Sequence, residues 1–111
     1  MSGTGIDIKR LQTIVDQWIT HVGGGYFSPL TNMAILSEET GEVASVMART
    51  YGDQKPKEGD KLLLADELAD VMWVVAAIAN QTGVDLEEAI LRNIDKKNQR
   101  DSLRFRNTDN E

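Results

Sequence analysis

The sequence predicts an all-α protein in which four helices pack as a single, bundle-like domain. Three observations support this prediction. Apolar residues recur at helical spacing in four stretches, no stretch keeps the apolar-polar alternation of a strand, and the links between the stretches are short. The 111 residues can build one small core, which we expect to span about residues 7–100, and an oligomer would bury more apolar surface.

The first two predicted helices flank a run of three glycines. Helical spacing of apolar residues predicts a first helix over about Asp7–Val22, which Gly23–Gly25 ends. Ser28 followed by proline has the pattern of an N-cap and a first helical residue, so the second helix covers Pro29–Tyr51. The glycine run lacks the following Lys and Ser or Thr of a phosphate-binding P-loop, so we interpret it as a hinge.

The third and fourth helices follow a polar loop at residues 52–59. The third helix covers about Asp60–Thr82, with an aspartate able to cap its start and Gly83 suited to the left-handed residue at its end. The fourth helix opens on an Asp-x-x-Glu capping pattern and covers about residues 85–100. We expect the charged tail, residues 101–111, to fray.

Composition and charge exclude several classes of protein. Eighteen acidic against twelve basic residues give a formal charge of −6, which is a poor basis for binding long nucleic acid. The absence of cysteine excludes disulfides, thiolate metal sites and cysteine nucleophiles. The longest apolar run, Val71–Ala79, is far shorter than the roughly 18–20 residues of a membrane span, and residues 1–7 lack a secretory pattern. We therefore expect a cytoplasmic protein that binds no membrane.

Two clusters of acidic residues lie within apolar helical sequence. Each places three acids within five positions, and together they comprise Glu38, Glu39, Glu42, Asp66, Glu67 and Asp70. Carboxylates among large apolar residues are costly unless a counter-charge compensates them, and the third helix has one basic residue, Lys61, at its start. The alternative is a solvated acidic face or salt bridges at helix ends, which explains most isolated Glu-x-x-Glu patterns.

A divalent metal is the compensation that the spacing favours. Each cluster contains an i,i+3 pair, Glu39 with Glu42 and Glu67 with Asp70. Two such pairs on facing helices can bring four carboxylates to one point. Oxygen ligands alone select a hard cation, Mg2+ or Mn2+. A di-iron bundle would need Glu-x-x-His on two helices, and the sole histidine, His21, lies on the first helix.

The acidic clusters belong to a longer pattern. Leu36–Val43 reads Leu-Ser-Glu-Glu-Thr-Gly-Glu-Val, and Asp66–Val71 reads Asp-Glu-Leu-Ala-Asp-Val. This pattern resembles the EExxE and ExxD signature of the MazG-like nucleotide pyrophosphohydrolases, in the all-α NTP pyrophosphatase superfamily, over roughly residues 11–100. The resemblance implies Mg2+-dependent hydrolysis of a nucleoside triphosphate to monophosphate and pyrophosphate. It also implies a homodimer or homotetramer that clears aberrant or excess nucleotides.

The resemblance assigns roles to the acidic residues by position. The implied metal ligands are Glu39, Glu42, Glu67 and Asp70. Glu38 matches the first acid of the signature, where it would orient or deprotonate the attacking water or reach a second metal. Mg2+ would invert the negative field of these carboxylates and bridge the phosphates of the substrate.

Further candidates lie outside the acidic clusters. Lys96 and Arg100 resemble the family's basic residues that contact phosphate, although a basic helix end also complements the helix dipole. Trp18 is a candidate to stack on the base, with Tyr26 and Phe27 as alternatives. We assign the second tryptophan, three residues after Asp70, to the core.

Two functions of other classes stay open at this point. The acids could be structural in a non-catalytic helical interaction module. Alternatively, the chain could be a sensor that binds a nucleotide or a metal without turnover. Release of pyrophosphate in the presence of Mg2+ and a panel of nucleotides distinguishes an enzyme from both.

Overall fold

The computed structural model of this chain describes residues 5–53, 58 and 60–109, and it leaves undescribed the side chains of residues 60–62 and 102–109. These residues form four α-helices and no strand, which confirms the all-α prediction. The helices are α1 (Ile8–His21), α2 (Pro29–Tyr51), α3 (Asp60–Thr82) and α4 (Leu86–Asp109). Residues 54–57 and 59 of the predicted polar loop lie outside the described residues.

Side-chain caps start three of the helices where the sequence predicted. Asp7 accepts a hydrogen bond from the amide of Arg10 at 2.7 Å, and Ser28 accepts one from the amide of Thr31 at 3.2 Å. Asp85 accepts one from the amide of Glu88 at 3.1 Å, at the start of α4. Each cap satisfies an amide that has no partner within the first turn.

α4 is longer than the sequence predicted. We expected the fourth helix to end near Arg100 and the tail to fray, but α4 continues to Asp109. No glycine or proline interrupts residues 86–109, so the stretch contains no residue that breaks a helix. The predicted helix end was wrong because polar composition alone does not end a helix, and fraying of the tail stays a prediction.

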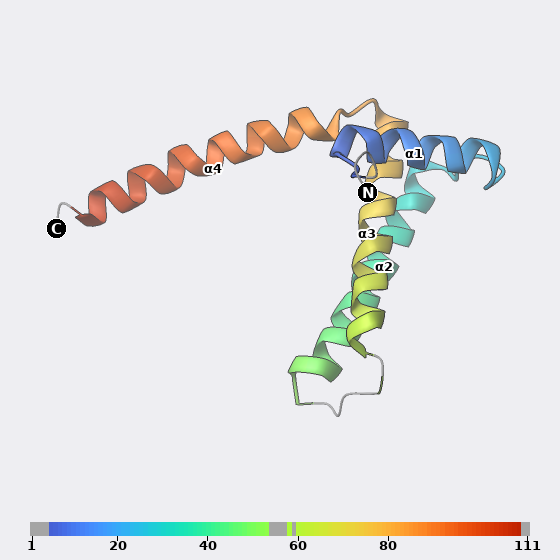
Figure 1. The fold of residues 1–111 in the computed structure, drawn as a ribbon, viewed down its shortest axis with the longest axis horizontal. Helices are drawn as coiled ribbons and strands as arrows, with labels where there is room; N and C mark the ends of the chain where they lie inside the picture. Colours follow the sequence, from blue (N-terminus) through green and yellow to red (C-terminus); the bar gives the residue numbers. More distant parts are fainter. Residues whose placement is uncertain (1–4, 54–57, 59, 110–111) are drawn as a thin grey trace.

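The α2–α3 hairpin is the main body of the fold (Figure 1). The two helices run antiparallel and pack along their length, α1 lies across one end of the hairpin, and α4 packs on α1 before projecting away. The core sits where α1 meets α3, and it contains Val15, Ala76 and Ala77. Its small side chains let the two helices approach closely.

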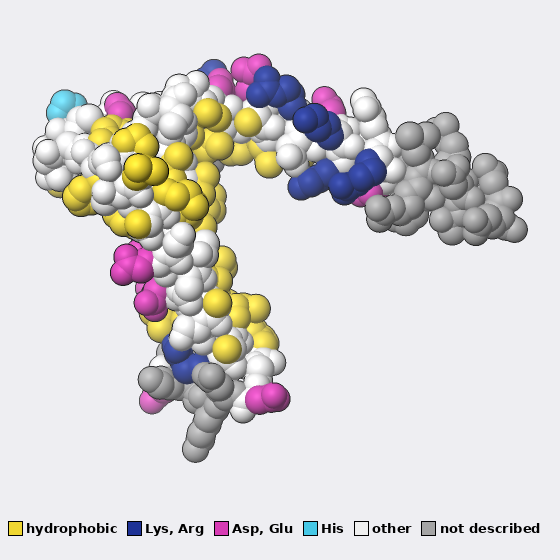
Figure 2. All heavy atoms as spheres, turned by 180° about the vertical axis from the view of Figure 1, so that it is seen from behind, with side chains coloured by type: hydrophobic (Ala, Val, Ile, Leu, Met, Phe, Trp, Pro, Cys, Tyr) yellow, Lys and Arg dark blue, Asp and Glu magenta, His cyan; other side chains and the backbone are white. Residues whose placement is uncertain are grey.

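One chain does not form a compact body. Its radius of gyration is 18.1 Å, against about 13 Å for a compact domain of this length. Figure 2 shows apolar side chains along the hairpin and in the corner below α4. Large apolar residues more than two-fifths exposed include Leu30, Met33 and Met47 of α2, Leu68 and Met72 of α3, and Leu91 and Ile94 of α4.

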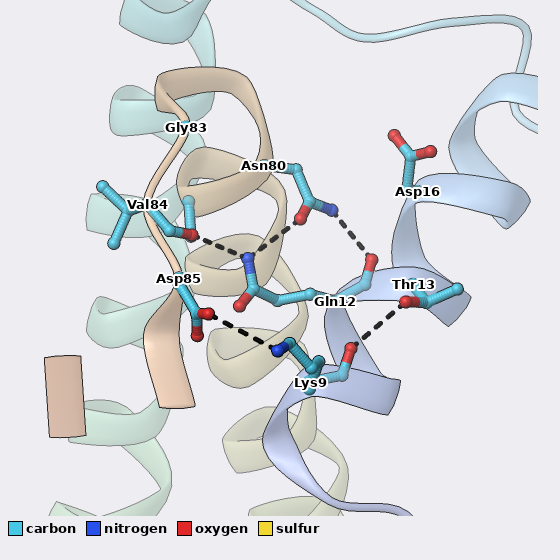
Figure 3. Close-up of a pocket in the computed structure, with 9 residues that line it drawn as sticks. Lys9, Gln12, Thr13, Asp16, Asn80, Gly83, Val84 and Asp85 are labelled. Carbon is cyan, nitrogen blue, oxygen red and sulfur yellow. Dashed lines mark hydrogen bonds and ion pairs between the residues drawn. The ribbon is translucent and has the colours of Figure 1, made fainter. Parts of the chain in front are cut away.

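Polar side chains fix the direction in which α4 leaves the hairpin (Figure 3). The Gln12 amide donates to Asn80 Oδ1 at 3.0 Å and to the Val84 carbonyl at 2.9 Å, and its oxygen accepts from the Leu86 amide at 2.8 Å. Asn80 donates back to the Gln12 carbonyl at 2.9 Å. These bonds tie α1 to the turn between α3 and α4, beside an open groove of about 460 Å³.

No helix among the described residues is long and apolar enough to cross a membrane.

We predict opposite effects from two Gly→Ala substitutions in open space. Gly83 has φ +72°, so Gly83→Ala should destabilise the fold by about 1 kcal/mol, because alanine disfavours this left-handed conformation. Gly41 lies inside α2, and Gly41→Ala should stabilise it by about 0.5–1 kcal/mol. Neither added methyl group meets an atom within 4 Å. Urea unfolding at fixed protein concentration measures both, and equal effects would contradict this account of the α3–α4 turn.

Candidate active site

Three carboxylates from the two hairpin helices converge on one point. One oxygen each of Glu39, Glu67 and Asp70 lies within 4.8 Å of the other two. Glu39 lies two helical turns from each of Asn32 and Val46, the buried residues of α2, so it is on the face that packs against α3. The same spacing relates Glu67 of α3 to the buried Val74. Both glutamates are half-buried, and Asp70 lies at the exposed edge.

Burial and electrostatic repulsion both act on Glu39. Burial raises the pKa of its carboxyl above the ordinary value, and the negative charges of Asp70 and then Glu67 raise it further. Glu38 and Glu42 add smaller contributions in the same direction. Ionised Glu39 is therefore destabilised by every charged neighbour that acts on it.

Ion pairs between described side chains join Lys9 with Asp85, Arg92 with Glu88, and Arg100 with Asp101, and none of these three pairs involves the three carboxylates. Oxygen-only donors at this spacing match the requirements of a hard divalent cation. The donor set and the raised pKa of Glu39 therefore fit a divalent metal.

The other predicted acids lie near this group but outside it. Glu42 follows Glu39 by three residues on α2, is exposed, and does not bring an oxygen into the three-carboxylate group. Glu38 and Asp66 are also exposed. The structure thus brings together three of the four predicted metal ligands.

An aromatic cavity of about 160 Å³ lies next to the cluster along both helices. Ile35, four residues before Glu39, and Trp73, three residues after Asp70, both line it. The cavity is therefore about one helical turn from the carboxylates. Its wall includes Trp18, whose ring meets that of Trp73 edge-to-face with centroids 5.6 Å apart.

The cavity lining includes one buried polar residue that we did not single out from the sequence, Asn32. Asn32 is 6% exposed and donates from its side-chain amide to Gln81 Oε1 at 2.8 Å. Gln81 in turn donates to the Phe27 carbonyl at 2.5 Å. Tyr26 donates to Asp16 at 2.6 Å, and burial followed by this hydrogen bond raises the pKa of its phenol. The sequence feature that could have indicated Asn32 is its position as a polar residue among the apolar residues at the start of α2.

The larger groove in Figure 3 is a poorer candidate for the site. Asn80, in its wall, lies ten residues beyond Asp70 on α3, which is about 15 Å along the helix. The side-chain amides of Gln12 and Asn80 in this groove already form hydrogen bonds to each other and to backbone carbonyls.

The predicted phosphate contacts, Lys96 and Arg100, do not approach the cluster within one chain. Both are exposed on the part of α4 that projects from the hairpin (Figure 1). Among the side chains that the structure describes, Arg100 forms an ion pair with its neighbour Asp101 at 3.3 Å. Figure 2 shows the basic side chains of α4 separated from the acidic side chains of the hairpin.

Comparisons with known proteins agree on one family. The model of the MazG nucleotide pyrophosphohydrolase domain matches residues 27–105. The uncharacterized protein YpjD of Bacillus subtilis is 41% identical over 100 residues, which cover 88% of this chain and 89% of YpjD.

Two solved structures share the fold. The structure of B. subtilis YpjD, described as a candidate pyrophosphatase, has a TM-score of 0.74 and 39% identity, covering 87% of this chain and 98% of that one. A Bacillus-conserved MazG protein, a nucleotide pyrophosphohydrolase, has a TM-score of 0.73 and 36% identity, covering 86% and 93%. With most of its length matched by the family model, this chain belongs to the MazG nucleotide pyrophosphohydrolase family and is an enzyme of that family.

Proposed function

We propose that this enzyme hydrolyses nucleoside triphosphates between the α and β phosphorus atoms, with Mg2+ as its metal. The observation that carries the proposal is the convergence of Glu39, Glu67 and Asp70 one helical turn from an aromatic cavity. Carboxylates suit the metal end of a nucleotide complex, and aromatic rings suit its base. The cellular role that we propose is removal of aberrant or excess nucleotides in the cytoplasm.

The three converging carboxylates would hold the ion, and Mn2+ could replace Mg2+. When bound, the ion neutralises the repulsion among the carboxylates and stabilises negative charge on the phosphoryl oxygens. Glu42, exposed on the next turn of α2, would join as the fourth ligand by a change of rotamer. Phosphoryl transfer depends mostly on positioning and charge, so the site needs no histidine or cysteine.

Glu38 is our candidate for the residue that orients or deprotonates the attacking water. It is exposed, adjoins Glu39 in the chain, and lies outside the three-carboxylate group, so its oxygens are available. A base acts on a water only from hydrogen-bond distance. Its neighbour Glu39 is therefore assigned to the metal and Glu38 to the water.

The aromatic cavity would take the base of the nucleotide. Trp18 is 48% exposed, so it can give up solvent contact to stack on a base, while Trp73 supports it from the core. The buried Asn32 amide is the polar group best placed to contact the edge of that base. We had assigned Trp73 to the core from the sequence; in this proposal it also forms part of the base pocket.

We also propose that the chain works as a homodimer or homotetramer. An extended body with exposed apolar residues on three helices needs a partner surface, and a second copy supplies one. Light scattering after size-exclusion chromatography measures the mass in solution.

The test of the function is a panel of canonical and modified nucleoside triphosphates with Mg2+, followed by separate detection of pyrophosphate, phosphate and monophosphate. Equal yields of monophosphate and pyrophosphate support the proposal. Release of phosphate and diphosphate would contradict α–β cleavage. Nucleotide binding without any product would instead identify a sensor.

We predict that Glu39→Gln and Asp70→Asn each lower kcat/KM by at least about a hundredfold, because each removes a charged metal ligand. The matched control is Glu87→Gln, a half-buried glutamate in the first turn of α4. It removes the same charge away from the cluster and should leave kcat/KM within about twofold of wild type. Activity of Asp70→Asn within a few fold of wild type would refute the ligand assignment.

We predict that Glu39→Gln raises the Tm of the protein in a metal chelator at pH 7. The pKa of Glu39 in the folded state is above its ordinary 4.5, so folding favours the protonated form. The wild type is therefore relatively stable below pH 4.5 and loses stability as pH rises through the folded-state pKa. The advantage of the variant should vanish near pH 4. A lower Tm for Glu39→Gln at pH 7 would show that a cation of the protein compensates this carboxylate.

We predict that Gly23→Ala and Trp18→Ala raise KM about tenfold, with smaller effects on kcat, because a base stacked on an aromatic ring is stabilised by roughly 1–3 kcal/mol. A methyl group at position 23 would lie 2.8 Å from Trp18 Cζ3 and would displace the ring. Gly5→Ala, where a methyl group meets nothing within 4 Å, is the control. Unchanged KM in both variants would exclude Trp18 from the nucleotide site.

A further inference from the structure

We propose that the aromatic cavity admits a pyrimidine base and excludes a purine, so that the enzyme acts preferentially on pyrimidine nucleoside triphosphates. This inference rests on the proposed function and adds the class of base to it. Its support comes from the volume of the cavity, the contacts that hold its walls, and its distance from the carboxylates.

The volume of the cavity matches a single six-membered ring. The cavity measures about 160 Å³. An apolar cavity of about 150 Å³ in an unrelated protein holds one benzene molecule. A pyrimidine is a ring of the same size, whereas a purine carries a second ring fused to the first. A purine therefore enters completely only if a wall of the cavity moves outward.

Contacts outside the cavity hold the aromatic rings of its wall in place. The Tyr26 hydroxyl donates to Asp16 at 2.6 Å and accepts from the Asn80 amide at 3.1 Å. Trp73 packs against the buried core where α1 meets α3, and Trp18 meets it edge-to-face with ring centroids 5.6 Å apart. Widening the cavity on these sides breaks the hydrogen bonds or the ring contact, so a purine gains less from entering it.

Asn32 gives the cavity a polar group that can pair with the edge of a base. Its amide nitrogen donates to Gln81 Oε1 at 2.8 Å, and Gln81 in turn donates to the Phe27 carbonyl. One amide hydrogen of Asn32 is left over, and no described group donates to its side-chain oxygen. A donor beside an acceptor matches the edges of both cytosine and uracil. Asn32 therefore orients the base, and the volume of the cavity selects its class.

Shallow insertion does not make a purine an equal substrate. The sugar of a purine nucleotide is attached to the five-membered ring, so insertion of the six-membered ring alone leaves the other ring in the mouth of the cavity. The sugar and phosphates then lie one ring width further out than those of a pyrimidine nucleotide. The carboxylates are only about one helical turn from the cavity, so this shift misplaces the reacting phosphates. Misplacement by about 1 Å can lower a rate about a hundredfold.

The first test measures kcat/KM for pyrophosphate release by the wild type with Mg2+, comparing CTP and UTP with ATP and GTP, and the four deoxyribose forms among themselves. We expect values at least about tenfold higher for the pyrimidines within a sugar series. Ratios below about threefold in both series, or higher values for a purine, would overturn this inference alone. Wild type that releases no pyrophosphate from any nucleotide refutes the proposed function, and the inference with it.

The second test enlarges the cavity. Ile35 is half-buried in its wall, and Ile35→Ala removes as many carbon atoms as a purine ring system has beyond a pyrimidine. We expect it to lower the pyrimidine-to-purine ratio of kcat/KM at least about fivefold. Leu36→Ala is the matched control, because Leu36 is also half-buried but does not line the cavity. It should leave the ratio within about twofold of wild type. Equal changes of the ratio in the two variants would contradict selection by this cavity.

Tryptophan fluorescence gives a readout independent of turnover, because both tryptophans of the chain line the cavity. The ligands are the α,β-methylene analogues of CTP and ATP, which are not cleaved between the α and β phosphorus atoms. With Mg2+ present, we expect the CTP analogue to quench the fluorescence with a Kd at least about tenfold lower than that of the ATP analogue. Equal Kd values, or tighter binding of the ATP analogue, would overturn the inference even in a variant that does not turn over.

Discussion

Three carboxylates held within 4.8 Å of one another repel each other where the two helices of the hairpin meet. Glu39 and Glu67 occupy positions on the packed faces of their helices that an apolar residue would normally fill. The pKa of Glu39 is raised by burial and by its acidic neighbours, which measures the cost of that placement. A bound cation would remove this cost, so we expect the proposed metal site to destabilise the metal-free fold.

The remaining features of the fold position groups around this cluster. The antiparallel hairpin brings acids from two distant segments together, and the same two helices, with α1 and the link that follows it, line the aromatic cavity one turn away. The contact of Asn32 with Gln81 joins α2 to α3 above the cavity. Gly23 leaves room for the Trp18 ring. The proposed metal ligands and the proposed base pocket therefore share one short stretch of the hairpin.

The helix boundaries and the acidic clusters were predictable from the sequence because they depend on residues close together in the chain. The caps at Asp7, Ser28 and Asp85 and the left-handed Gly83 depend on neighbours in the chain, so their residue types sufficed to place the helix boundaries. The acidic clusters were predictable as a pair because both lie at helical spacing within apolar sequence. The family followed from the longer pattern around them.

Long-range contacts were not predictable in the same way. The direction of α4 depends on Gln12, more than seventy residues from Val84 and Leu86, and nothing in the spacing of the sequence indicates that pairing. Trp73 was assigned to the core, but its contact with Trp18 also makes it a wall of the cavity. The spacing likewise placed four carboxylates at one point, whereas the rotamer of an exposed Glu42 leaves three.

The most direct test of the central claim is titration of Mn2+ into metal-free protein, followed by the electron paramagnetic resonance signal of the free ion. The account predicts that wild type removes the free signal in a saturable manner, and that Glu39→Gln and Asp70→Asn leave most of it. Wild type that leaves the free-ion signal unchanged, or variants that deplete it as fully as wild type, would contradict the assignment of Glu39, Glu67 and Asp70 as a metal site.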